Sequence, residues 1–284
     1  MIIQNFFGGI GNQLFQYAAA YSLSLKSKKI LFYDYSLKDT FKKKHISNIS
    51  DVFDIDINNV VPTNNFFGPL HNLFKRLFLK FLFLSKLPLF FLTENNYKIV
   101  LNRKLNKIVM LGYWQDINFF NKHETNLKRQ LKFKNFRKNF KILNLIKNSN
   151  SIFIHFRQGD YLNKSNKVNY SLPIDYYCKA IDFMKKKVKR PFFFIFSDDI
   201  NSISKVFFEK KIFNEKFKIL KNNHDYEDLF YMTNCKHSII SNSTFAWWGA
   251  WLNHNKKKIV IYPNLWFKNF KKSPDIFSKS WIKL

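Results

Sequence analysis

The sequence predicts an α/β fold with two domains, each built around a parallel β-sheet. The chain opens with a strand–helix–strand pattern, and a second series of short apolar strands alternating with helices begins near residue 151. Helices that connect successive strands make those strands parallel members of one sheet. A Lys- and Asn-rich stretch at 121–150 separates the two patterns. We therefore expect an N-terminal domain over residues 1–140 and a C-terminal domain over residues 141–284.

The N-terminal pattern begins with an apolar strand over residues 1–7, followed by the Gly-rich turn GGIGNQ. Apolar residues at helical spacing then predict a helix that ends near Lys26, and KKILFYDYS predicts a second strand. The turn has close-approach glycines but lacks the third glycine of a dinucleotide fingerprint, because Leu14 follows Gln13. The sequence leaves two interpretations of this segment: a loop that contacts a nucleotide, and a purely structural turn.

The segment 66–92, FFGPLHNLFKRLFLKFLFLSKLPLFFL, is dense in Phe and Leu and carries four basic residues without an acidic one. We expect a helical insertion in the N-terminal domain here. One interpretation is a helix buried in that domain, and the other is a basic helix that rests on an anionic membrane surface.

The C-terminal pattern alternates short, mostly apolar strands with amphipathic helices, which is typical of a doubly wound α/β domain. The predicted strands are 151–157, 191–196, 217–220, 237–240 and 258–263, and the predicted helices are 174–188, 201–211, 225–234 and 243–253.

Composition limits the class of protein. A chain of 284 residues buries a large core without a disulfide or metal, and Cys178 and Cys235 form no CxxC pair. The start MIIQNFFGG lacks the basic and apolar regions of a signal peptide, and no uninterrupted apolar stretch of about 18 residues occurs. We expect a cytoplasmic protein with a reduced, metal-free interior.

The net charge of +29 does not by itself identify a partner. Only six of the 48 basic residues are arginine, and the lysines are scattered along the chain. Abundant Lys, Asn, Phe and Ile are typical of an AT-rich genome. A functional interpretation is attraction to an anion, such as a nucleotide diphosphate, an acidic membrane or a nucleic acid. Nucleic-acid surfaces favour arginine, so a nucleic-acid-binding protein is the more distant alternative.

Polar side chains follow three strands of the C-terminal pattern. Open α/β sheets bind ligands beyond the carboxyl ends of their strands, so these residues predict a site for an anionic ligand. They are His155, Arg157, Gln158, Gly159 and Asp160 after the first strand, Ser197 and Asp198 after the second, and Ser241, Asn242, Ser243 and Thr244 after the strand 237–240.

Each of these residues has a structural and a functional interpretation. Arg157 is suited to a bidentate contact with a diphosphate, or to an ion pair with Asp160 alone. Ser243 and Thr244 open a helix, where they cap backbone N–H groups or bind phosphate oxygens. A lone His155 is a structural hydrogen-bonding group or a catalyst.

Two acidic motifs lie outside this group. Asp54 and Asp56 in FDID have the spacing that places a divalent ion on a nucleotide-sugar in some glycosyltransferases, but the motif is short and distant from the strand ends, so we expect no metal site. Asp225, Glu227 and Asp228 at the start of the helix 225–234 complement its dipole or contact a ribose or base.

Five blocks of the sequence resemble, in order, the bacterial α-1,2-fucosyltransferases, which are inverting enzymes that use GDP-L-fucose. The resemblance spans nearly the whole chain. The blocks are GGIGNQLFQYA, GYWQD, IHFRQGDY (similar to the H-x-R-R-x-D segment of the family), FSDD and YEDLFYMTNCKHSIISNSTFAWWGAWLN. The family commonly has a second arginine where this chain has Gln158, which puts the affinity for the donor, and its identity, in question.

The resemblance implies a GT-B-like fold, in which two Rossmann-type domains face each other across a cleft. The C-terminal domain would hold the GDP-sugar and the N-terminal domain would lie on the acceptor side. Catalysis would need no metal and no cofactor other than the donor substrate GDP-L-fucose.

The implied catalytic residues are Arg157, Asp160 and His155. Arg157 would bind the pyrophosphate, and Asp160 is the first candidate for the base, ahead of Asp198. The implied donor-binding residues are Gly9, Gly11, Asn12 and Gln13 of the first turn, together with Ser197, Asp198, Asn242, Ser243 and Thr244.

The expected reaction transfers L-fucose to the 2-hydroxyl of galactose in an oligosaccharide, which is lipid-linked if the basic segment 66–92 contacts the inner face of the cytoplasmic membrane. Three alternatives remain: another GDP-sugar or acceptor hydroxyl, a non-catalytic carbohydrate-binding relative, and a nucleic-acid-binding protein. The retention of Arg157 and Asp160 argues against the second.

Overall fold

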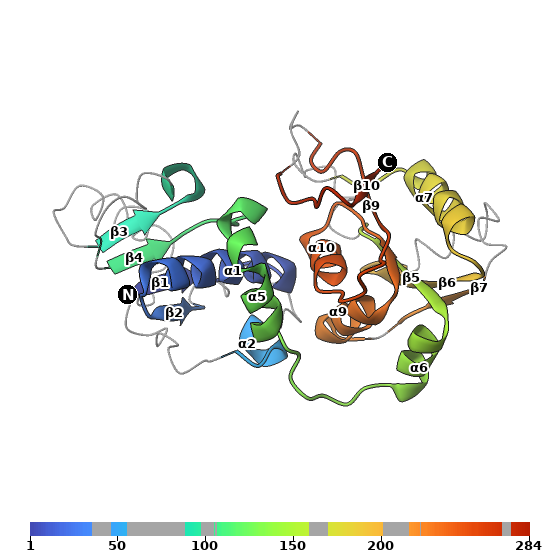
Figure 1. The fold of residues 1–284 in the computed structure, drawn as a ribbon, viewed down its shortest axis with the longest axis horizontal. Coiled ribbons are helices and arrows are strands. Elements are labelled where there is room, and N and C mark those ends of the chain that lie inside the picture. Colours follow the sequence, from blue (N-terminus) through green and yellow to red (C-terminus); the bar gives the residue numbers. More distant parts are fainter. Residues whose placement is uncertain are drawn as a thin grey trace. The chain divides into compact units, whose positions relative to one another are not determined.

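The computed structural model describes residues 1–35, 47–55, 89–97, 105, 107–158, 170–200, 216–221, 223–268 and 274–284. The chain divides into two compact units, Met1–Lys134 (unit 1) and Asn135–Leu284 (unit 2). Both units combine a parallel β-sheet with helices, which confirms the predicted α/β class (Figure 1).

Unit 1 contains a four-stranded sheet in the order β2-β1-β4-β3, and every pairing in it is parallel. Its strands are β1 (Ile2–Asn5), β2 (Leu31–Asp34), β3 (Leu89–Leu92) and β4 (Lys107–Met110). Helix α1 (Ile10–Ser27) connects β1 to β2, so the predicted strand–helix–strand opening is confirmed. The other helices within the described part of unit 1 are α2 (Ile49–Val52), η2 (Glu94–Asn96), η3 (Ile117–Phe119), η4 (Asn121–His123) and α5 (Glu124–Gln130).

The expectation of a helix over 66–92 is wrong at its C-terminal end. Residues 89–92 form β3, which pairs in parallel register with β4. A short apolar run such as LFFL does not by itself distinguish a buried helix from a buried strand, and pairing with β4 decides the outcome here. The rest of that segment, up to residue 88, lies outside the described residues.

Unit 2 contains a six-stranded sheet in the order β10-β9-β8-β5-β6-β7, again parallel at every pairing. Its strands are β5 (Asn150–Phe156), β6 (Pro191–Ser197), β7 (Lys216–Ile219), β8 (His237–Ile239), β9 (Val260–Tyr262) and β10 (Ile282–Lys283). Its helices are α6 (Phe140–Asn148), α7 (Ile174–Lys187), α9 (Asp225–Asn234) and α10 (Thr244–Trp251). The predicted helix 201–211 lies outside the described residues.

Helices pack against both faces of the unit 2 sheet, which explains why β5 is apolar without alternation. Ile152 and Ile154 belong to the core cluster that includes the buried side of α7. Phe153 points to the opposite face, where α9 and α10 lie side by side (Figure 1). Gly249 permits this packing, because an added Cβ would lie 3.0 Å from the Met232 Cβ and 3.4 Å from the Phe153 ring.

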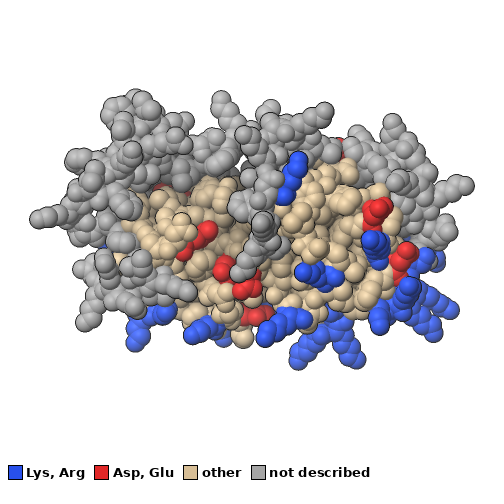
Figure 2. Space-filling view, turned by 90° about the horizontal axis from the view of Figure 1, so that it is seen from above, with Lys and Arg blue, Asp and Glu red and all other residues tan. Residues whose placement is uncertain are grey.

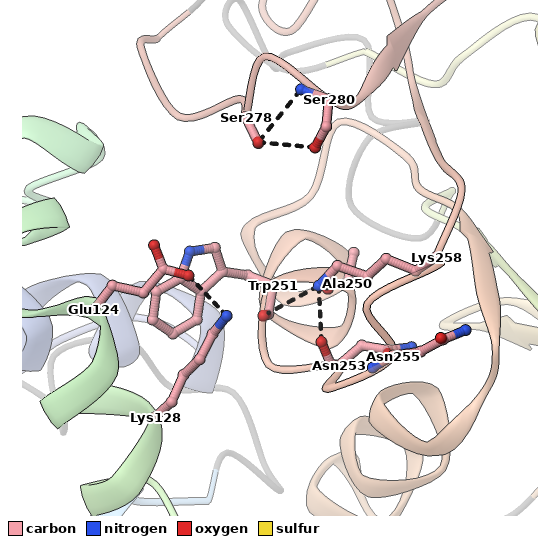
Figure 3. A network of polar contacts seen from close by, with 9 residues as sticks. All are labelled: Glu124, Lys128, Ala250, Trp251, Asn253, Asn255, Lys258, Ser278 and Ser280. Carbon is pink, nitrogen blue, oxygen red and sulfur yellow. Dashed lines mark hydrogen bonds and ion pairs between the residues drawn. The ribbon is translucent and has the colours of Figure 1, made fainter.

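A lysine caps the carboxyl end of α10. Lys258 Nζ donates hydrogen bonds to the carbonyl oxygens of Ala250 at 2.7 Å and Asn253 at 2.8 Å, and it lies 3.5 Å from that of Trp251 (Figure 3). A cation at this end satisfies free carbonyls and complements the helix dipole. Other basic side chains project at several separate places on the visible surface (Figure 2). At least one lysine of this basic chain therefore serves the fold.

None of the described helices is both long and apolar enough to cross a membrane.

Candidate active site

The polar residues predicted to lie beyond three strand ends meet at one edge of the unit 2 sheet. Strands β8, β5 and β6 are neighbours and parallel, so their carboxyl ends share that edge. A hydrogen bond of 2.7 Å between His155 Nδ1 and Ser241 Oγ joins the end of β5 to the end of β8. An ion pair of 3.1 Å between Arg157 Nη1 and Asp198 Oδ2 joins β5 to β6.

Asp198 uses one oxygen for Arg157 and the other for the residue that follows it. Oδ2 accepts from the Arg157 guanidinium, and Oδ1 accepts from the backbone N–H of Gln158 at 2.9 Å. The Arg157 side chain is 28% exposed, so its head group is oriented yet accessible to a ligand. The partner expected from sequence, Asp160, and the adjacent Gly159 lie outside the described residues.

His155 is buried and uncharged at neutral pH. Burial, together with the nearby Arg157 cation, lowers its pKa from 6.5 to about 3. A neutral imidazole bonded to Ser241 supplies a fixed hydrogen-bonding group, but a base with so low a pKa removes a proton weakly near pH 7. The predicted catalytic role of His155 stays a prediction, and the geometry favours positioning over proton transfer.

The start of α10 borders the same edge. Ser243 is the N-cap residue of this helix, it is buried, and within the described chain its hydroxyl makes no capping bond. Thr244 is the first residue of α10 and is partly exposed. Backbone N–H groups at such a helix start are suited to phosphate oxygens. Donor contacts by Ser243 and Thr244 are consistent with this placement and stay predictions.

Asn242 and Ser197 make hydrogen bonds within unit 2. The Asn242 side-chain nitrogen donates to the carbonyl oxygens of Tyr170 at 3.1 Å and Trp266 at 3.2 Å, which ties two chain segments to the end of β8. Ser197 Oγ accepts from the Asp199 N–H at 2.9 Å. Both residues lie at the predicted strand ends, and their contacts with a donor stay predictions.

The Gly-rich turn of unit 1 forms the start of α1. Gly9 is the exposed N-cap residue, and Gly11 is buried. Apart from the chain neighbours of Gly9 and its own helix, no atom of the described residues lies within 4 Å of the place where a Gly9 Cβ would be. Asn12 Oδ1 accepts from Gln115 Nε2 at 3.3 Å. The donor roles predicted for these residues, and for Gln13, stay predictions.

Gln13 is completely buried and has a clear structural role. Its Nε2 donates to the carbonyl oxygens of Gly8 at 3.0 Å and Ser47 at 3.2 Å, and its Oε1 accepts from the Ile49 N–H at 3.1 Å. A contact between the Gln13 amide and a donor would have to replace bonds that hold the turn to the start of α2.

Sequence reasoning missed Ser241 as a partner of His155 and Gln115 as a partner of Asn12. Gln115 follows β4, a strand that was not predicted although KIVM is a β-type apolar run before a glycine. For the metal motif, Asp54 is described and Asp56 is not, and in the described ranges no three His, Cys, Asp or Glu side chains are arranged so that they could hold a metal ion.

The comparisons with known proteins agree on one family of enzymes. Residues 95–284 match the family described as glycosyl transferase family 11. The chain is 32% identical to the O-antigen biosynthesis glycosyltransferase WbnK of Escherichia coli, with 98% of each chain covered. It is 29% identical to an alpha-1,2-colitosyltransferase of Escherichia coli, with 100% of this chain and 99% of that protein covered.

A solved structure shares the fold. NodZ alpha-1,6-fucosyltransferase soaked with GDP-fucose aligns with a TM-score of 0.51 over 88% of this chain and 92% of that chain, at 15% sequence identity. The predicted GT-B-like class and the family resemblance are both confirmed. The chain belongs to glycosyl transferase family 11, and it is a glycosyltransferase with the α/β fold of the fucosyltransferases.

Proposed function

We propose that the protein transfers L-fucose from GDP-β-L-fucose to the 2-hydroxyl of a galactoside, with inversion and without a metal. The observation that carries the proposal is the Arg157–Asp198 pair, which presents an oriented guanidinium at the sheet edge where α10 also begins. A diphosphate leaving group needs such a cation and such N–H donors. The name of one relative, an alpha-1,2-colitosyltransferase, supports a deoxy-sugar donor and a 1,2 linkage.

The reaction forms a bond between the acceptor oxygen and C1 of fucose while the bond from C1 to the β-phosphate oxygen breaks. The electron pair of the breaking bond leaves with GDP, and Arg157 stabilises the charge that develops there. A base takes the acceptor hydroxyl proton. Asp198 already accepts from Arg157 and Gln158, so we assign it to orienting Arg157 and keep Asp160 as the first candidate for the base.

Another GDP-sugar is the alternative donor, because a relative is named a colitosyltransferase and Gln158 replaces a family arginine. Colitose is L-fucose without its 3-hydroxyl. A site that hydrogen-bonds this hydroxyl rejects the deoxy analogue by about 10⁴-fold, whereas a site without such a group discriminates weakly. The ratio of kcat/KM values for GDP-L-fucose and GDP-colitose therefore identifies the donor.

The test is a donor panel. GDP-L-fucose, GDP-colitose, GDP-mannose and UDP-galactose are each assayed for nucleotide release with galactosides that differ at the reducing end, with and without EDTA. We expect the highest kcat/KM with GDP-L-fucose, an α-1,2 linkage in the product by NMR, and no effect of EDTA. Faster transfer from another GDP-sugar would replace the donor assignment, and loss of activity in EDTA would refute the metal-free reaction.

The acceptor is a galactose-containing oligosaccharide that is lipid-linked at the inner face of the cytoplasmic membrane. The O-antigen role in the name of one relative and the basic residues of this chain support this part of the proposal. Co-sedimentation with phosphatidylglycerol vesicles at low salt should exceed that with phosphatidylcholine vesicles and fall as salt is added. Equal sedimentation with both would argue against membrane contact. Tight, salt-dependent DNA binding would favour the nucleic-acid alternative.

We expect Asp198→Asn to lower kcat about 10-fold, because the Arg157 guanidinium is then no longer held in the orientation that contacts the leaving group. Asparagine keeps an acceptor for the Gln158 N–H and removes the charge that holds Arg157. The neighbouring Asp199→Asn is the matched control, with the same change in net charge and a rate within about threefold of wild type. An Asp198→Asn enzyme of normal rate would show that Arg157 needs no positioning.

A further inference from the structure

A second group of polar and aromatic residues lies at the carboxyl edge of the unit 1 sheet. Strands β1 and β4 are neighbours and parallel, so the turn after β1 and the segment after β4 emerge at the same edge. Gln115 Nε2 donates to Asn12 Oδ1 at 3.3 Å across these two segments. The Phe7 and Tyr113 rings meet edge to face, with centroids 4.9 Å apart and planes at 68°.

Trp114 fixes the segment after β4 in an unusual conformation. Its φ is +57°, which a bulky side chain rarely adopts, and its ring is completely buried against Phe119 and Tyr97. The Trp114 N–H donates to a carboxylate oxygen of Glu94. Such backbone strain persists where surrounding contacts enforce it, and it recurs at ligand sites. The anchored Trp114 leaves Tyr113, which precedes it, 44% exposed.

Tyr113, which is exposed, and Asn12 and Gln115, which are partly exposed, have the chemistry that binds an uncharged sugar. Tyr113 offers an aromatic surface to the C–H face of a pyranose, and the amides of Asn12 and Gln115 are donors and acceptors for its hydroxyls. Gly9 leaves the adjacent backbone open as far as the described residues show, because an added Cβ at this position would meet none of their atoms within 4 Å beyond its chain neighbours and its own helix. None of these residues carries a charge, so the group lacks a cation for a diphosphate.

We propose that Tyr113, Gln115 and Asn12 form a subsite for the galactose unit of the acceptor, on unit 1. This inference rests on the proposed function for the identity of the sugar. It moves Asn12 from the donor site, where the sequence placed it, to the acceptor. Gln115 acts with Asn12 as an amide pair, and the Phe7 ring supports Tyr113.

The test measures sugar binding and nucleotide binding separately. Methyl β-D-galactopyranoside is titrated by saturation-transfer NMR and GDP by calorimetry, on wild type and on Tyr113→Ala, Tyr113→Phe and Gln115→Leu. We expect Tyr113→Ala to weaken galactoside binding about 10-fold and Gln115→Leu about 5-fold, with GDP binding unchanged. Tyr113→Phe keeps the ring and should stay within about threefold of wild type.

Phe140→Ala is the matched control, because Phe140 is an exposed aromatic residue of unit 2, and it should leave galactoside binding unchanged. Thermal unfolding of each variant checks that it is folded. Equal galactoside binding by wild type and Tyr113→Ala, no binding by wild type, or a loss of GDP binding in Tyr113→Ala would overturn the subsite. Galactoside binding that depends on Tyr113 in a protein that transfers no fucose would refute the proposed reaction alone.

Discussion

Replacement of Arg157 by alanine should lower kcat at least about 100-fold, the scale seen when a single group that stabilises developing negative charge is removed. In the structure this guanidinium is the cation that Asp198 orients at the edge where β8, β5 and β6 end. The measurement is initial-rate kinetics of GDP release at saturating GDP-L-fucose and galactoside. Because the lost interaction forms mainly in the transition state, kcat should fall more than KM rises.

Arg157→Lys separates charge from geometry. Lysine keeps the positive charge and loses the planar fork that binds two phosphate oxygens, so we expect an intermediate rate, about 10-fold below wild type. Combining Arg157→Ala with Asp198→Asn should cost little more than Arg157→Ala alone, since Asp198 acts through Arg157. A near-normal rate for Arg157→Ala would refute its role at the leaving group, and additive losses would refute the positioning role of Asp198.

Replacement of Asp228 by asparagine should stabilise the protein above pH 7. Burial raises the pKa of this carboxyl from 3.8 to about 7, even though Asn223 Nδ2 donates to it at 2.7 Å. The folded state then holds a proton that the unfolded state releases, so the free energy of unfolding falls as pH rises from about 4 to about 7. A pKa difference of one between the folded and unfolded states corresponds to about 1.4 kcal/mol, so asparagine should recover about 2 to 4 kcal/mol at pH 8.

The measurement is urea unfolding of the wild type and of Asp228→Asn from pH 4 to pH 8, followed by the fluorescence of unit 2. The difference in free energy should be smallest near pH 4, grow up to pH 7 and then level off. Asp182→Asn is the control for net charge, because Asp182 is exposed on α7. A gap of constant size across this range would show that Asp228 does not titrate between pH 4 and pH 8. A gap that Asp182→Asn reproduces would assign the effect to net charge.

Elements whose signals are local were predictable from the sequence. The helix predicted over 225–234 is observed as Asp225–Asn234, since acidic residues occupy its first turn and Glu227 accepts from the His224 N–H at 2.8 Å. Strand β3 was mistaken for the end of a helix because its apolar run becomes a strand only through pairing with β4, which is distant in sequence. Strands β4 and β10 were not predicted: β10 has only two residues, whereas β4 has four, as many as the predicted strand β7.

The candidate site, too, was predictable from local signals and not from contacts between segments distant in sequence. The rule that ligands bind beyond strand ends brought His155, Arg157 and Asp198 together correctly. The ion pair between Arg157 and Asp198 was not predicted, because Asp198 becomes a neighbour of Arg157 only once β6 pairs with β5. The expected pair between Arg157 and Asp160 stays a prediction, since Asp160 lies outside the described residues. The roles of these residues toward a donor depend on atoms of the ligand and stay predictions.

The strand order of unit 2 has a consequence for how the chain folds during synthesis. Strands β5, β6 and β7 can pair as soon as they are made, but β5 keeps an open, apolar edge until β8 arrives, and β9 keeps one until Ile282–Lys283. Unit 1 has all the strands of its described sheet by Met110. Nascent unit 2 therefore exposes an unpaired strand edge, which is prone to aggregation, until translation reaches residue 283. We expect unit 2 to depend on chaperones more than unit 1 does.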